Sequence, residues 1–133
     1  MNKSEQFWTI GELTKEFDVT ARALRFYEDK GLLSPLRDGT MRKYSARDRV
    51  RLILLLQGKR FGLSLDEIRD LLNLYHSEGG RRVQMVQTAQ KLRHQIKVLE
   101  DKKNDLEEVL KTLREYTDDI ENQLASTQNN IDA

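Results

Sequence analysis

The sequence predicts an all-α protein with one small β-hairpin, in which a short N-terminal lobe is followed by a single long helix. Three observations support this fold class. Helix-capping patterns recur along the first half of the chain, each followed by apolar residues at helical spacing. The stretch Arg-Asp-Gly-Thr at 37–40 is a turn sequence between two short potential strands. After the double glycine at 79–80, the chain contains neither Pro nor Gly and repeats apolar residues every three or four positions.

The first expected helix begins at Thr9, because Thr9 and Glu12 have the spacing of a capping box. Its apolar stripe consists of Ile10, Leu13 and Phe17. Asp18 then permits a tight turn, since Asp tolerates left-handed backbone geometry better than most residues.

The second expected helix is capped by Thr20 and ends at Gly31, a residue suited to the left-handed position after a helix. Leu32 and Leu33 are expected to fold back on the helix, and Pro35 prevents its continuation. Two short helices joined by a tight turn are the pattern of a helix-turn-helix, whose second helix enters the major groove of DNA.

The segment 34–44 predicts a β-wing with a basic edge. The turn at 37–40 would join two short strands. The returning strand carries Arg42, Lys43 and Tyr44. A wing beside a helix-turn-helix is a more specific pattern than either feature alone.

Two further helices complete the winged helix-turn-helix lobe, for which we expect the boundaries 7–76. The third would begin at Ser45 and run to about Phe61, and the fourth would begin at Ser64. The core residues expected in the third are Val50, Ile53, Leu54 and Leu56. Those expected in the fourth are Leu65, Ile68, Leu71 and Leu72.

Residues 81–125 predict a coiled coil, followed by a polar tail at 126–133. Ten of the twelve expected seam positions are apolar. The seam consists of Met85, Ala89, Leu92, Ile96, Leu99, Lys103, Leu106, Leu110, Leu113, Thr117, Ile120 and Leu124. At 1.5 Å per residue the seam is about 60 Å long. A lobe of this size cannot cover such a stripe, so we expect a homodimer.

The position of Lys103 favours an antiparallel dimer. Lys103 lies near the middle of the seam, so two parallel, in-register chains would bring two lysines together. Reversing one chain instead places Lys103 beside Leu106. The lysine stem could then reach outward to an acidic neighbour. Single lysines at such positions also occur in parallel dimers.

Composition narrows the classes of function. The chain has 133 residues, no cysteine and two histidines, which excludes thiolate chemistry and leaves too few histidines for a metal cluster. We expect no metal, no cofactor and no enzyme activity, because no phosphate-binding glycine loop or catalytic constellation is recognisable. No signal peptide or membrane-spanning run is recognisable either, so we expect a cytoplasmic protein without a membrane partner.

Charge is distributed unevenly along the chain. Residues 1–62 contain 13 Lys and Arg against 8 Asp and Glu, whereas residues 63–133 contain 10 against 14. The first part therefore carries about +5 and the second about −4. Only the first part is suited to binding a polyanion.

The second helix provides the candidate contact surface for double-stranded DNA. Arg22, Arg25 and Phe26 fall on one side of it, while Leu24 and Tyr27 turn the other way. Arginine can bind guanine or phosphate, and an aromatic edge can pack on a thymine methyl group. The full set of candidate DNA-binding residues is Thr20, Arg22, Arg25, Phe26, Tyr27, Arg42, Lys43, Tyr44, Lys59 and Arg60.

Some of these candidates have a second interpretation. Tyr44 would either contact phosphate through its hydroxyl or pack beneath the wing. Lys59 and Arg60 would either anchor a phosphate or stabilise the carbonyl end of their own helix. Arg42 and Lys43 are expected to clamp phosphates, which makes binding dependent on salt.

The chain resembles the MerR family of bacterial transcriptional regulators. The resemblance rests on WTIGELTKEFDVTARALRFYEDKGLL, on the wing ending in RKYS and on FGLSLDEIRDLL, and it covers residues 7–75. It implies that Arg22, Arg25, Phe26 and Tyr27 belong to the recognition helix and that Arg42 is the wing arginine. Family members often have Tyr in place of Phe26 and Gly-Tyr-Arg in place of residues 40–42, so two hydroxyl contacts to phosphate are missing here.

The resemblance also implies a mechanism. The dimer would bind a pseudo-palindrome within a promoter and distort the DNA so that RNA polymerase can engage it. The stretches FDVTARALRFYEDKGLLSP and SARDRVRLILLLQGKR are similar to regulators of leucine, isovalerate and branched-chain acyl-CoA degradation. That branch would imply a small carboxylate or acyl-CoA effector. The short tail after Leu124 leaves no room for a separate drug-binding domain.

Two other functions remain compatible with the sequence. One is an architectural or recombination-related DNA-binding protein without a small-molecule effector. The other is a coiled-coil adaptor whose basic lobe binds an acidic protein.

Overall fold

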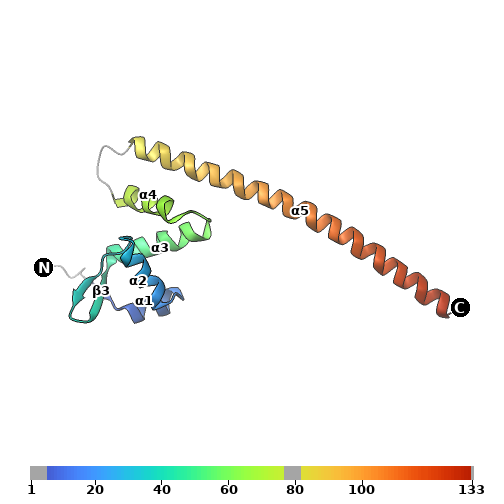
Figure 1. Cartoon of the computed structure of the whole chain (residues 1–133), viewed down its shortest axis with the longest axis horizontal. Helices are drawn as coiled ribbons and strands as arrows, with labels where there is room; N and C mark the ends of the chain where they lie inside the picture. The colour runs from blue at the N-terminus through green and yellow to red at the C-terminus, as the bar shows by residue number, and fades with distance from the viewer. Residues whose placement is uncertain (1–5, 77–81, 133) are drawn as a thin grey trace. The chain divides into compact units, whose positions relative to one another are not determined.

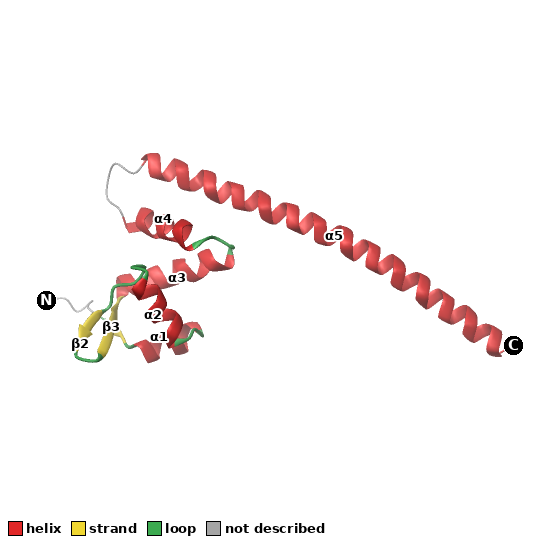
Figure 2. Cartoon of the chain, in the orientation of Figure 1, coloured by secondary structure: helices red, strands yellow, loops and turns green. Residues whose placement is uncertain are grey.

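The computed structural model describes residues 6–76 and 82–132, and the chain divides into two units at residues 91 and 92. Figures 1 and 2 show short helices and a small sheet in the first unit and one long helix that continues through the second. The elements are β1 (Phe7–Trp8), α1 (Ile10–Phe17), α2 (Ala21–Asp29), β2 (Leu36–Asp38), β3 (Met41–Ser45), α3 (Ala46–Arg60), α4 (Leu65–His76) and α5 (Arg82–Asp132).

Helices α1 and α2 begin at the two predicted caps. The Thr9 hydroxyl accepts from the Glu12 amide at 3.1 Å, and the Glu12 carboxylate accepts from the Thr9 amide at 2.9 Å. The Thr20 hydroxyl accepts from the Ala23 amide at 3.0 Å. Between the helices, Asp18 has a φ of 53°, the left-handed geometry expected of it. The predicted helix-turn-helix is therefore present.

Helix α2 ends at Asp29, and Gly31 occupies the predicted position just after the helix. The Leu32 amide donates to the Tyr27 carbonyl at 2.9 Å, and the Gly31 amide donates to the Glu28 carbonyl at 2.9 Å. This pair of bonds requires a left-handed residue after the helix, and Gly31 supplies it with a φ of 74°. Leu32 and Leu33 are then buried against the core.

The wing belongs to a three-stranded antiparallel sheet of order β1-β3-β2. Asp38 pairs with Met41, so Gly39 and Thr40 form the loop, and the turn lies one residue later than predicted. Strand β1 was not predicted, because two residues are too few to establish an alternating pattern. It pairs Trp8 with Tyr44 and attaches the wing to the start of α1.

Helices α3 and α4 begin with the predicted capping boxes at Ser45 and Ser64. The predicted core of α3 was wrong. Val50, Ile53, Leu54 and Leu56 are half-buried. The buried residues of α3 are instead Asp48, Arg51, Leu52, Leu55 and Gly58. In α4, Ile68 and Leu72 are fully buried, whereas Leu65 and Leu71 are half-buried.

The two charged residues in the core hold α3 to the segment that follows α2. One Asp48 oxygen accepts from the Ser34 amide at 3.0 Å and the other from the Ser45 amide at 3.4 Å. Arg51 Nε donates to the Leu32 carbonyl at 2.9 Å. These bonds satisfy buried polar groups and fix the path of the chain between α2 and the wing.

Helices α3 and α4 pack closely at Gly58. A β-carbon at this position would lie 2.8 Å from Ile68 Cγ1, closer than normal packing allows. Glycine in a helix interior lowers helix stability, but the absence of a side chain at Gly58 allows α4 to approach α3 closely. The core around this contact consists of Leu13, Leu24, Tyr27, Leu32, Leu33, Tyr44, Leu52, Leu55, Leu63, Ile68 and Leu72.

Helix α5 is continuous over 51 residues and includes positions 126–132, which belong to the predicted polar tail. In the part of the chain that the structure describes, none of the helices has the length and hydropathy needed to cross a membrane.

Candidate nucleic-acid interface

Helix α2 presents one basic and aromatic face to solvent. Arg22 and Arg25 are exposed, and 44% of Phe26 is exposed, although Phe is a residue that folding usually buries. On the other side of the helix, Leu24 and Tyr27 are buried in the core. The predicted division of this helix into two sides is confirmed.

Phe26 lies beneath a cation that the sequence analysis did not consider. Lys30 Nζ lies 5.5 Å from the centre of the Phe26 ring, a distance compatible with a cation–π contact. The i, i+4 spacing of the two residues was the available signal. Lys30 therefore adds a third positive charge to the exposed face of α2.

The wing is joined to α2 by ion pairs at Glu28, which the sequence analysis also did not consider. Arg42 Nε donates to Glu28 at 2.8 Å, and Arg37 Nη2 donates to the other carboxylate oxygen. Burial raises the pKa of Glu28, but the hydrogen bonds from Arg42 and Arg37 outweigh this effect and keep the pKa below its ordinary value. Glu28 thus binds both strands of the hairpin, β2 through Arg37 and β3 through Arg42.

This network changes which wing residues face solvent. The Arg42 side chain is only 19% exposed, whereas that of Arg37 is 55% exposed. Lys43 Nζ lies 3.2 Å from the Asp38 carboxylate, and both groups lie at the surface. Arg37 and Lys43 are therefore more accessible to a phosphate than Arg42.

Two of the predicted contact residues are in the core. Tyr27 is 3% exposed and Tyr44 is 0% exposed, so neither presents a surface to DNA. For Tyr44, the structure agrees with the interpretation that the ring packs beneath the wing. Its hydroxyl has no hydrogen-bond partner among the described residues, and burial raises its pKa.

Lys59 and Arg60 lie in the last turn of α3. Lys59 Nζ donates to the Tyr27 hydroxyl at 3.1 Å and lies 5.5 Å from the centre of that ring. Lys59 therefore contacts α2 on its buried side, through Tyr27. Arg60 is exposed, and Thr20 remains exposed at the start of α2 although its oxygen already caps that helix.

Comparison with known families decides the identity of this arrangement. A family described as "MerR HTH family regulatory protein" matches residues 8–75, and one described as "MerR, DNA binding" matches residues 49–116. The chain belongs to the MerR family. The predicted family is thereby confirmed.

Several MerR-family proteins are similar to this chain. The transcriptional regulator CueR of Yersinia pestis is 40% identical over 70 residues, which cover 51% of this chain and 50% of that protein. A mercuric resistance operon regulatory protein of Serratia marcescens is 40% identical over 77 residues, covering 56% and 53%. The match thus spans about half the length of these relatives. Both are named as regulators, not as enzymes.

Solved structures of MerR-family proteins have the same fold. A transcriptional regulator of Bacillus cereus has a TM-score of 0.66 and 28% identity, covering 83% of this chain and 79% of that one. HiNmlR, a regulator solved bound to promoter DNA, has a TM-score of 0.59 and 22% identity, covering 73% and 75%. The predicted fold class, a winged helix-turn-helix lobe with a long C-terminal helix, is confirmed.

Helix α5 of this MerR-family chain carries a long apolar stripe on its surface. Of the predicted seam positions, Leu92 is half-buried and the others are exposed. Val109 and Tyr116 are also exposed, each directly before a predicted seam position, so the stripe is wider than predicted. The Thr117 hydroxyl donates to the Leu113 carbonyl at 2.7 Å, which satisfies the one neutral polar residue of the seam.

Proposed function

We propose that this chain is a transcriptional regulator that binds double-stranded DNA with α2 in the major groove. The observation that carries the proposal is the exposed face of α2, where Arg22, Arg25 and Phe26 point away from a core that holds the helix through Leu24 and Tyr27. Arginines on this face can bind guanine or phosphate, and a base edge would cover the Phe26 ring.

The wing supplies contacts to the DNA backbone in this proposal. Arg37 and Lys43 are the more exposed cations of the hairpin; Arg42 shares Glu28 with Arg37, and Lys43 pairs with Asp38. Arg60 provides a further cation at the end of α3. Contacts of this kind bind phosphates of any sequence, so they contribute affinity and salt dependence instead of specificity.

We further propose that α5 pairs with α5 of a second copy in antiparallel orientation. The exposed apolar stripe needs a cover, and Lys103 near its centre disfavours the parallel arrangement. Two lobes joined in this way would read a pseudo-palindromic site. Distortion of that site would control access of RNA polymerase to the promoter, in the cytoplasm of the cell.

The names of the relatives do not support the expected branch that regulates branched-chain acyl-CoA degradation. One relative is named as the regulator of a mercuric resistance operon, yet this chain contains no cysteine to bind a thiophilic metal. Among the described residues, no three potential metal-ligating side chains lie together.

The proposed function can be tested by genome-wide footprinting with the purified protein, followed by binding assays on the enriched sites. We expect protection of short inverted repeats in promoter regions and an affinity that falls steeply with salt. Uniform binding to all DNA and to unrelated polyanions would contradict the proposal and favour the adaptor interpretation.

A further inference from the structure

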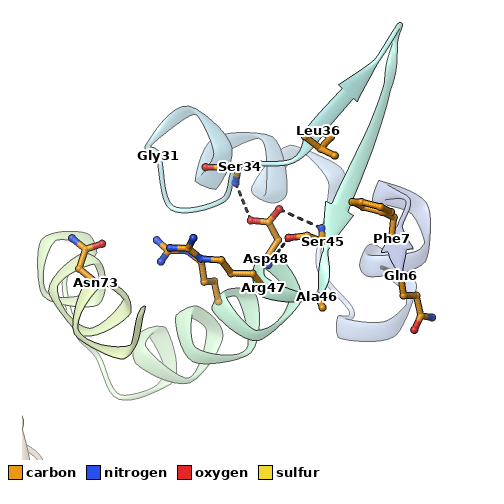
Figure 3. A pocket seen from close by; sticks show the side chains of 11 residues that line it. Gln6, Phe7, Gly31, Ser34, Leu36, Ser45, Ala46, Arg47, Asp48 and Asn73 are labelled. Atoms are coloured by element: carbon orange, nitrogen blue, oxygen red, sulfur yellow. Dashed lines mark hydrogen bonds between the residues drawn. The ribbon is translucent and has the colours of Figure 1, made fainter. Parts of the chain in front are cut away.

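A cavity of about 630 Å³, which is open to solvent on one side, lies within the first unit on the side of α3 that faces the wing. Its walls come from β1, from the connection between α2 and β2, from the start of α3 and from α4 (Figure 3). This volume is within the range of small-molecule sites, about 300–1,000 Å³. None of its lining residues belongs to the exposed face of α2.

The cavity carries a net positive charge. Among the described residues that line it, the ionisable ones are Arg47, Arg51 and Asp48, whose charges sum to +1. Asp48 already accepts two backbone hydrogen bonds, from Ser34 and Ser45 (Figure 3). Arg51 is 9% exposed and donates through Nε to the Leu32 carbonyl. Burial lowers the pKa of Arg51, and the neighbouring charge of Arg47 lowers it further, so the two guanidinium groups repel each other.

Arg47 is the group through which a ligand could relieve this repulsion. It is exposed, and no ion pair or hydrogen bond of its side chain occurs within residues 6–76 and 82–132. Asn73 lines the same cavity from α4 and carries a neutral amide that can donate. Phe7 and Leu36 give another part of the wall an apolar surface.

We propose that this cavity binds a small organic monocarboxylate, with Arg47 and Asn73 holding the carboxylate and Phe7 and Leu36 contacting its hydrocarbon part. A single negative charge matches the net charge of the described lining residues, and guanidinium groups bind carboxylates through paired hydrogen bonds. The role of this ligand as an effector rests on the proposed DNA-binding function; its binding does not.

Occupation of the cavity would act on the DNA-binding surface through its walls. Gly31 and Ser34 lie between the recognition helix and the wing, and Leu36 lies in the wing itself. A ligand that bridges these residues and Arg47 restrains the angle between α2 and the hairpin. A bound carboxylate therefore changes the affinity for DNA by a coupling free energy between the two sites.

The experiment is calorimetric titration of the full chain with straight-chain and branched monocarboxylates of two to six carbons, each paired with its neutral amide. Variants are Arg47→Gln, at the cavity, and Lys111→Gln, which removes one exposed charge from the outer face of α5. We expect a carboxylate to bind at least about tenfold more tightly than its amide, a preference that Arg47→Gln abolishes and Lys111→Gln retains. DNA affinity without carboxylate should be the same for both variants and the wild type.

Three results would overturn the inference. The first is equal binding of the amide and the carboxylate, or no binding of either. The second is preferential binding of inorganic phosphate, which carries more charge than the site can match. The third is loss of DNA affinity on Arg47→Gln in the absence of carboxylate, which would make Arg47 a phosphate contact. Failure of the wild type to bind DNA would instead refute the proposed function and leave the calorimetric result standing.

Discussion

Glu28 on the recognition helix accepts a hydrogen bond from Arg42 Nε on the wing at 2.8 Å, across 14 residues of sequence. Arg37 on the neighbouring strand donates to the same carboxylate. The two elements that are proposed to contact DNA are therefore joined to each other in the free protein. Such preorganisation lowers the entropy lost when both elements bind at once.

Glu28→Gln should lower the free energy of unfolding by about 1–3 kcal/mol near neutral pH, because charge-assisted hydrogen bonds become neutral ones. The pKa of Glu28 is below its ordinary value of 4.5, so its stabilising contribution is present above that pH and is lost as the pH falls through the folded-state pKa. Urea unfolding of both proteins at a series of pH values measures this. A difference that persists in strong acid would contradict the interpretation.

The control for this variant is Asp29→Asn, on the same helix and with the same loss of charge. Asp29 is exposed at the carbonyl end of α2, and no ion pair of its side chain occurs among the described residues. Removing a negative charge from that end of a helix should leave stability unchanged or slightly increased.

Phe26 and Tyr27 are neighbours whose replacement should have opposite consequences. Phe26→Ala should lower the free energy of unfolding by no more than about 1 kcal/mol but weaken DNA binding by about tenfold, because the exposed part of the ring is covered in the complex. Tyr27→Ala should lower the free energy of unfolding by about 3–5 kcal/mol, because it empties a buried site. Thermal unfolding and fluorescence-anisotropy titration measure the two effects. Normal DNA binding by Phe26→Ala would remove this residue from the interface.

Arg22 and Lys43 should differ in the kind of DNA binding they support. Arg22→Ala should cost about 1–3 kcal/mol on the preferred site and relax its sequence preference. Lys43→Ala should weaken binding to all sequences and lower the slope of affinity against salt by about one. Lys15→Ala, on the exposed surface of α1, is the control and should leave both properties unchanged. If Arg22→Ala and Lys43→Ala changed sequence preference and salt dependence in the same way, neither residue would read bases.

Gly58→Ala should destabilise the lobe, although alanine is the better helix former. The added β-carbon would lie 2.8 Å from Ile68 Cγ1, and this overpacking should exceed the gain of about 1 kcal/mol in helix propensity. Gly11→Ala is the matched control, because its nearest neighbour would be 3.8 Å away. Urea unfolding should show a loss for the first and no loss for the second. The cost of Gly58→Ala should also shrink in an Ile68→Ala background.

The direction of pairing along α5 can be measured with spin labels. The chain has no cysteine, so Gln84→Cys and Asn104→Cys each introduce one labelling site on the outer face of the predicted seam. In an antiparallel dimer, two labels at 104 should be close and two labels at 84 should be about 60 Å apart. Short distances for both pairs would indicate a parallel dimer, and the absence of any dipolar coupling would indicate a monomer.

The features that could be predicted from the sequence are those set by neighbouring residues. The caps at Thr9, Thr20 and Ser45 and the helix end at Gly31 depend on bonds within a few positions of the chain. The exposed side of α2 could be predicted for the same reason, since helical periodicity alone separates Arg22 from Leu24. The starts of these helices and the two sides of α2 were therefore predicted correctly.

The features that could not be predicted depend on partners distant in sequence. Helix α3 contains apolar residues on every side, so periodicity could not show which side is buried. The buried side also includes two charged residues, Asp48 and Arg51. Their acceptors and donors lie on the connection after α2. The role of Glu28 similarly depends on Arg37 and Arg42, which lie on the wing and are distant in sequence. Pattern arguments assign a charged residue to the surface unless its partner is known.

The sheet that fixes the wing contains a structural weakness at Tyr44. Its ring is fully buried, but its hydroxyl has no hydrogen-bond partner among the described residues. An orphaned hydroxyl of this kind costs about 1–3 kcal/mol, which phenylalanine would recover without changing the shape of the ring. Selection for heat resistance should therefore favour phenylalanine at this position. A higher melting temperature of Tyr44→Phe than of the wild type would support this.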